Sequence, residues 1–219
     1  MKKESKNKVI PFFRGQSAAN TSKIADTFEF RRGGRLNDVS IAYETWGELN
    51  PSKSNVIVIF TGLSASSHVT SSSFDSTAGW WESMVGSGKP IDSEKYFIVC
   101  INTLGSCFGS TSPVSINRST EQPYRLSFPE LTVEDMAMAS NMLMEKLSIN
   151  NINILIGPSL GGMQALAYSI MFSKKVRNTI LISTATQATP YAIAIRSLQR
   201  EVIRKDPDWN NGFYSYEKP

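Results

Sequence analysis

The sequence predicts an α/β protein built on a mostly parallel, doubly wound sheet with flanking helices. Four short apolar runs rich in β-branched residues support this prediction, at residues 56–60, 96–102, 152–156 and 179–183. Runs without polar alternation are typical of parallel strands buried on both faces. Helical segments separate or follow these runs. This alternation places ligand chemistry at the carboxyl ends of the strands.

The chain begins with a basic segment. The 219 residues carry a net charge of +4, to which residues 1–36 contribute +6 and the remainder −2. No basic patch is interleaved with aromatic residues in the manner of a nucleic-acid site, so we expect residues 1–25 to form a flexible, solvated tail. The 219 residues are enough for one domain with a sizeable core.

A hairpin is expected before the first buried strand. Residues 27–30 and 39–46 predict two short strands, and Gly-Gly and Asn-Asp pairs within residues 33–38 favour the turn between them. Residues 48–52 contain Asn, Pro and Ser, which predict a surface turn.

Three helices are expected along the rest of the chain. Residues 132–147 begin with a capping pattern, in which Thr132 is followed by Asp135. Residues 162–172 come soon after the third apolar run, and residues 189–205 open with a Thr-Pro pair that is typical of a helix start.

The composition excludes several classes of protein. No apolar run is long enough to span a membrane, and the lysine-rich start lacks the apolar core of a signal peptide. Two cysteines, Cys100 and Cys107, predict reduced thiols and therefore a cytoplasmic location. Together with one distant histidine they do not make a zinc site, so we expect no metal.

The G-x-S-x-G pattern at residues 157–161 is the strongest chemical signal. It lies between a predicted strand and a predicted helix, the context in which a sharp turn presents a serine as a nucleophile. Glycines flank Ser159 because such a turn is strained and brings strand and helix close together. The alternative interpretation is a glycine-rich turn whose serine has no role.

A serine nucleophile of this kind also needs donors for the developing oxyanion. In an α/β-hydrolase arrangement one donor is the N–H of the residue after the nucleophile, here Leu160, and the other lies in the loop after an earlier strand. We assign the second donor to the N–H of Leu63. The glycine-rich residues 104–111 lack the GK[ST] ending of a phosphate loop, and we interpret them as a wall of the serine pocket.

The base that should activate Ser159 is not evident. In α/β-hydrolases the triad acid and histidine both follow the serine, but no histidine follows Ser159. The single histidine, His68, is either an unusually placed base or part of a loop or pocket wall. Asp206 and Asp208 are interpreted as a solvated turn, with a triad acid as the alternative. The chain is therefore expected to be truncated at its C-terminus.

Longer motifs carry a resemblance to a known family. From residue 38 to the end, the chain resembles the homoserine O-acetyltransferase family, including its serine O-succinyltransferase branch, within the α/β-hydrolase superfamily. The motifs that carry this resemblance are VSIAYETWGELN, TGLSASSHV, YRLSFPELTVEDM, GPSLGGMQAL and QREVIRKDPDWNNGFY.

The resemblance implies acyl transfer from acetyl-CoA or succinyl-CoA to the hydroxyl of L-homoserine or L-serine, in methionine or cysteine biosynthesis. The route would be ping-pong through an acyl-serine at Ser159, with the Leu63 and Leu160 amides as the oxyanion hole. It implies acyl-CoA as co-substrate, no bound cofactor, and homodimers for full-length members.

Two departures from the family bear on the function. The residues Pro158 and Leu160 replace the usual Gly and Met around the nucleophile, which favours the serine-acylating branch. Family members also continue into a helical lid and then to the catalytic aspartate and histidine, which would lie beyond Pro219. The resemblance therefore implies that residues 26–219 are the N-terminal part of an α/β-hydrolase domain, up to the start of the lid. We expect Arg200 to be solvated or at the base of this lid. The alternatives are a serine esterase or hydrolase of the same fold and a catalytically inactive truncated chain.

Overall fold

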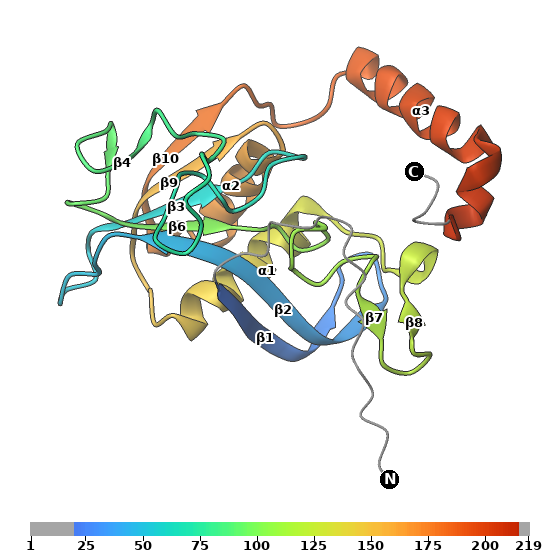
Figure 1. Ribbon diagram of the computed structural model, residues 1–219, viewed down its shortest axis with the longest axis horizontal. Helices are drawn as coiled ribbons and strands as arrows, with labels where there is room; N and C mark the ends of the chain where they lie inside the picture. Colours follow the sequence, from blue (N-terminus) through green and yellow to red (C-terminus); the bar gives the residue numbers. More distant parts are fainter. Residues whose placement is uncertain (1–19, 215–219) are drawn as a thin grey trace, which may run out of the picture.

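A six-stranded sheet organises the computed structural model, which describes residues 20–214 (Figure 1). The strand order is β1-β2-β6-β3-β9-β10. The strands are β1 (Asn20–Glu29), β2 (Arg35–Trp46), β3 (Val56–Phe60), β6 (Phe97–Ile101), β9 (Ile152–Pro158) and β10 (Val176–Ile182). The four strands from β6 to β10 are parallel, and each of them overlaps one of the four predicted apolar runs.

The predicted entry hairpin is confirmed, but its strands are longer than expected. β1 and β2 pair antiparallel, and β2 also pairs antiparallel with β6. The boundary expected at residue 25 falls inside β1, because Ile24 and Phe28 are both buried against the core. The Lys23 side chain lies on the exposed side and pairs with Asp26 and Asp38. The rest of the predicted tail, residues 1–19, lies outside the described residues.

Two helices cover one face of the sheet. α1 (Val133–Lys146) packs on β1 and β2, and α2 (Leu160–Met171) packs on α1, β3, β9 and β10. Leu143 of α1 and Tyr168 of α2 are buried in the resulting core. The predicted capping box of α1 is present, since Thr132 and Asp135 each accept a hydrogen bond from the other's backbone N–H. A short 3₁₀ turn, η2 (Ser173–Lys175), leads from α2 to β10.

The opposite face is covered by irregular chain instead of a helix. Val69, Val85 and Ile91 come from the long connection between β3 and β6 and pack on Ile57 and Ile98. This connection contains only two short strands, β4 (Val85–Gly86) and β5 (Ile91–Asp92). The connection between β6 and α1 contains β7 (Ile116–Asn117), β8 (Gln122–Pro123) and the 3₁₀ turn η1 (Arg125–Ser127).

The third predicted helix stands away from the sheet. α3 (Pro190–Lys205) has no buried residue, and the 3₁₀ segment η3 (Pro207–Gly212) follows it. Figure 1 shows α3 (red) projecting beyond the carboxyl end of β10. Arg125 of η1 connects the segment after α3 to the rest of the domain. Its guanidinium donates a hydrogen bond to the Gly212 carbonyl and lies 4.7 Å from the centre of the Phe213 ring.

Candidate active site

Ser159 occupies a strained turn between β9 and α2. Its φ of 53° and ψ of −120° lie in a region that non-glycine residues rarely adopt. Strain of this kind persists only where the surrounding structure enforces it, and it concentrates at functional sites. The strand–turn–helix context predicted for the pentapeptide is thus present, although the helix begins at Leu160, two residues earlier than expected.

The glycines of the turn are required by close backbone approach. A Cβ on Gly161 would lie 2.6 Å from the carbonyl oxygens of Phe60 and Thr61 at the end of β3. A Cβ on Gly157 would lie 2.1 Å from the Gly161 oxygen. Real Cβ atoms do not tolerate such contacts with backbone, so only glycine fits where β9 enters α2 beside β3.

The end of β10 braces the same turn. The Ser159 N–H donates a 2.9 Å hydrogen bond to the Ile182 carbonyl. The Thr184 hydroxyl donates a 2.8 Å hydrogen bond to the Ser159 carbonyl. Ser183 between them also has a positive φ, of 48°. Both backbone polar groups of Ser159 are therefore held by one neighbouring segment.

A cleft of about 620 Å³ opens over Ser159. Its walls come from the loop after β3, the serine turn, the segment after β10 and residues 192–200 of α3. Leu63 and Leu160 both line it with Ser159. A Cβ on Gly62 would lie 4.0 Å from the Ser159 Cβ, so the loop after β3 runs directly beside the serine. Within residues 20–214, neither the Leu63 nor the Leu160 amide donates a hydrogen bond.

Two arginines line the cleft, and the sequence interpretation had not placed them there. Arg196 and Arg200 are four residues apart on α3, so they share one face of the helix. They bond neutral side chains nearby, Gln199 and Ser197 respectively, and neither pairs with a carboxylate among the described residues. The four-residue spacing of the two arginines was the sequence signal that could have placed them on one face of the predicted helix.

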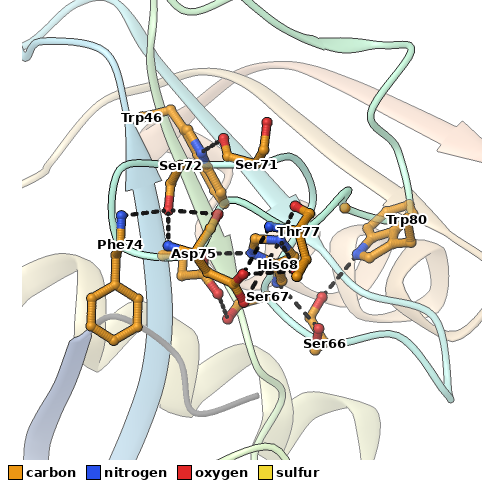
Figure 2. A network of polar contacts seen from close by, with 12 residues as sticks. Trp46, Ser66, Ser67, His68, Ser71, Ser72, Phe74, Asp75, Thr77 and Trp80 are labelled. Atoms are coloured by element: carbon orange, nitrogen blue, oxygen red, sulfur yellow. Dashed lines mark hydrogen bonds and ion pairs between the residues drawn. The ribbon is translucent and has the colours of Figure 1, made fainter. Parts of the chain in front are cut away.

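His68 does not contact Ser159. The imidazole is buried, with its Nδ1 3.1 Å from the Glu44 carboxylate and its Nε2 2.9 Å from the Thr77 carbonyl. Figure 2 shows the ring enclosed by its own loop, close to Asp75 and Thr77. Of the two roles left open by the sequence, the geometry supports the loop role.

Two further sequence interpretations, of residues 104–111 and of the aspartates after α3, can be compared with the structure. Residues 104–111 do not line the cleft, because this loop folds onto β2, where Ser110 and Thr111 bond backbone groups of Ala42 and Ser40. Asp206 and Asp208 form an exposed turn as expected, with Asp206 accepting from the Asp208 N–H.

Residues 20–214 contain no group of three or more potential metal ligands, and no helix in this range is long and apolar enough to cross a membrane.

Comparison with known proteins places this geometry in a family. A family model described as the alpha/beta hydrolase fold matches residues 55–219. The chain is 54% identical over 184 residues to the serine O-succinyltransferase of Litchfieldella anticariensis, a match that covers 84% of this chain and 50% of the relative. The chain thus spans about half the length of the curated relatives that it matches.

Two solved structures share the fold closely. The homoserine O-acetyltransferase of Bacillus anthracis superposes with a TM-score of 0.83 at 31% identity, covering 90% of this chain and 55% of that one. Esterase E22 superposes with a TM-score of 0.82 at 32% identity, covering 90% and 56%. From the family match and the serine turn together, the chain belongs to the alpha/beta hydrolase fold family.

Proposed function

We propose that Ser159 is the acyl-accepting nucleophile of an acyl-CoA-dependent O-acyltransferase that acts on L-serine or L-homoserine. The observation that carries this proposal is the strained Ser159 turn at a cleft that Leu63 and Leu160 also line. Among residues 20–214, neither of these two amides donates a hydrogen bond. The 54% identity to a serine O-succinyltransferase favours L-serine as the acceptor.

In the proposed first step, the Ser159 Oγ attacks the thioester carbonyl carbon of the acyl-CoA. The negative charge moves onto the carbonyl oxygen, where the Leu63 and Leu160 N–H groups donate to it. The C–S bond then breaks, coenzyme A leaves as the thiolate, and an acyl ester remains on Ser159. The amino-acid hydroxyl attacks this ester in the second step and regenerates the serine.

Each step requires a base that removes a hydroxyl proton. Among residues 20–214 no histidine contacts Ser159, because the one histidine of the sequence bonds Glu44 and Thr77. A histidine from residues 20–214 therefore does not serve as the proton acceptor in the proposed reaction.

The charge of the cleft favours a dicarboxylic acyl donor. Arg196 and Arg200 line it, and no carboxylate from residues 20–214 does. A succinyl group ends in a carboxylate that can accept hydrogen bonds from a guanidinium, whereas an acetyl group cannot. We therefore propose succinyl-CoA as the donor. The reaction needs acyl-CoA as co-substrate and no further cofactor. A cytoplasmic location and a homodimeric full-length protein belong to the same proposal.

A chimaera tests the proposed function. Residues 1–219 are joined to the half of the Litchfieldella anticariensis enzyme that this chain does not match, and coenzyme A release is measured with succinyl-CoA and L-serine. The expected result is serine-dependent release that Ser159→Ala abolishes, with a succinyl ester on Ser159 detected by mass spectrometry. A folded chimaera that releases coenzyme A equally well with Ser159→Ala would overturn the proposal.

The second candidate function is ester hydrolysis. It is favoured by the similarity to esterase E22, which is as high as that to the homoserine O-acetyltransferase. Water would then replace the amino acid in the second step. The same chimaera separates the two functions, since an esterase would release coenzyme A or cleave a p-nitrophenyl ester at a rate that added L-serine or L-homoserine does not change.

A further inference from the structure

The buried pair of His68 and Glu44 is the strongest polar feature that the proposed reaction does not use. His68 is 3% exposed and Glu44 is 4% exposed. They come from different parts of the fold, since Glu44 lies on β2 and His68 lies in the connection after β3. A buried charged group is tolerated only when it is paired and hydrogen-bonded, so this pair must be organised precisely.

The contacts of the imidazole favour the doubly protonated ring. Nδ1 faces the Glu44 carboxylate and Nε2 faces the Thr77 carbonyl, and both of these groups can only accept hydrogen bonds. The Thr77 hydroxyl also lies 3.4 Å from Nε2, but it donates to Asp75 at 2.7 Å. A neutral imidazole carries one N–H, whereas an imidazolium carries two and satisfies both contacts.

The same pair is joined to the loop that carries Leu63. The Ser67 hydroxyl donates to Glu44 at 3.3 Å, and the Ser67 N–H donates to the Asn102 side chain at 2.5 Å. Asn102 donates back to the Ser67 hydroxyl at 3.1 Å and to the Phe108 carbonyl at 2.7 Å. Residues 66–68 are therefore fixed to β2 and to the end of β6, only a few residues after Leu63.

We propose that His68 is a positioning residue held as an imidazolium between Glu44 and Thr77, and that this ion pair fixes the loop 61–68 so that the Leu63 N–H faces Ser159. The role assigned to Leu63 rests on the proposed function. The protonation state of His68 and its effect on the loop do not.

The surrounding charges determine the direction of the pH dependence. Burial tends to lower the pKa of His68, but the hydrogen bonds to Thr77 and Glu44 and the negative charges of Glu44 and Asp75 raise it above its usual value overall. The Cys100 thiol beside Glu44 stays protonated, because burial and the Glu44 charge raise its pKa. The ion pair is therefore complete at pH values below the pKa of an unfolded histidine, and it is lost as the pH rises through the raised pKa of the folded state.

The experiment uses the fact that the chain has a single histidine. Long-range ¹H–¹⁵N NMR spectra of the 219-residue chain are recorded from pH 5 to 10, with amide hydrogen exchange measured over residues 61–70. We expect both ring nitrogens to carry protons at the acidic end of this range, and the imidazolium to lose one proton in a single step whose pKa lies above the usual value of histidine. Protection factors in residues 61–70 should fall about tenfold or more across that step, because a hydrogen bond to a charged group is lost.

The matched variant is Glu44→Gln. The new amide can donate to a neutral His68 at Nδ1, while Nε2–H still donates to Thr77, so the loop should stay protected without any pH step. Asp75→Asn keeps the hydrogen bond from Thr77 and removes only a charge 4.0 Å from the ring. This variant should therefore lower the pH at which His68 titrates. The fall in amide protection of residues 61–70 should still occur, at that lower pH. If Glu44→Gln does not fold, Asp75→Asn still tests the linkage.

Three results would overturn the proposal. A His68 ring that carries only one proton at pH 5 would refute the imidazolium. A His68 titration that leaves amide exchange in residues 61–70 unchanged would refute the link to the loop. The link would also be refuted if Asp75→Asn shifted the His68 titration but not the pH at which amide protection falls. None of these measurements involves acyl transfer, so they can fail while the proposed reaction stands, and the chimaera can fail while they succeed.

Discussion

The hydroxyl of Thr184 donates a 2.8 Å hydrogen bond to the backbone carbonyl of Ser159. These two residues are 25 positions apart and lie at the carboxyl ends of neighbouring parallel strands, β10 and β9. The strained serine turn is thus held by a side chain from outside the pentapeptide that identified it. Packing accompanies the hydrogen bond, since a Cβ on Gly162 would lie 2.5 Å from the Thr184 methyl group.

Replacing Thr184 by Val should loosen this turn. The substitution removes the hydroxyl and keeps the shape, so the free energy of unfolding should fall by about 0.5–1.5 kcal/mol, the net contribution of one hydrogen bond. Chemical denaturation measures this change. Thr184→Ser keeps the hydroxyl and is the control; a Ser variant as unstable as the Val variant would assign the effect to the methyl group instead.

Gly161→Ala should be far more disruptive than Gly62→Ala. The new Cβ at position 161 would lie 2.6 Å from two backbone oxygens that cannot move independently of β3, whereas a Cβ at position 62 meets nothing closer than 3.9 Å. We expect a loss of about 2–3 kcal/mol or more for Gly161→Ala, against a change within about 0.5 kcal/mol for Gly62→Ala. Thermal melts of both variants test the contrast, and equal melting temperatures would refute it.

Arg196→Met and Arg200→Met should weaken succinyl-CoA binding selectively. A charge-assisted hydrogen bond contributes about 1.5–3 kcal/mol, so each variant should lose about tenfold or more in affinity. Calorimetric titration with acetyl-CoA, which shares the coenzyme A portion, is the ligand control. Arg204→Met is the protein control, because Arg204 pairs with Glu201 and does not line the cleft. Equal losses for the two donors would mean that the arginines bind coenzyme A and not the succinyl group.

The 219-residue chain on its own should release coenzyme A from succinyl-CoA no faster than its Ser159→Ala variant. The reason is that Ser159 has no histidine partner among the described residues. A spectrophotometric thiol assay with and without L-serine makes this comparison. Serine-dependent release that disappears in Ser159→Ala would show that another group acts as the base.

The two cysteines should differ in reactivity. Cys107 is exposed and Cys100 is fully buried, where burial and the nearby Glu44 charge raise the pKa of the thiol. A thiol reagent such as Ellman's reagent should therefore react with one thiol in the folded protein and two after denaturation. Cys107→Ser should abolish the reaction of the folded protein; a remaining fast-reacting thiol would indicate that β6 opens readily.

The buried strands and the serine turn could be predicted because their signals are local. β3 forms at the predicted residues, and the capping box of α1 is readable from Thr132 and Asp135 alone. The start of β1 was missed because Ile24 and Phe28 lie in a stretch that is otherwise polar, and only the core that β1 shares with β2 and α1 buries them. The sequence did not predict that the connection between β3 and β6 covers the sheet face opposite α1 and α2, because this connection has almost no regular hydrophobic periodicity.

The parts of the site that could not be predicted depend on contacts between distant residues. Glu44 and His68 are 24 residues apart on separate elements, and nothing in the local sequence of either indicates the other. The residues 104–111 were placed in the cleft because they follow a strand end, but hydrogen bonds to β2 hold them elsewhere. Arg196 and Arg200 were readable as a pair from their spacing, whereas the position of α3 over Ser159 was not.

The position of β3 at the centre of the sheet also has a consequence during synthesis. Its two neighbours are β6 and β9, and Ile57 pairs with Ile154, which is 97 residues further along the chain. At translation rates of roughly 5–20 residues per second, β3 would leave the ribosome about 5–20 s before β9. During that interval the fully apolar segment Val56–Phe60 has no complete set of partners. The nascent chain should therefore depend on a holding chaperone most strongly in the period before β9 has been made.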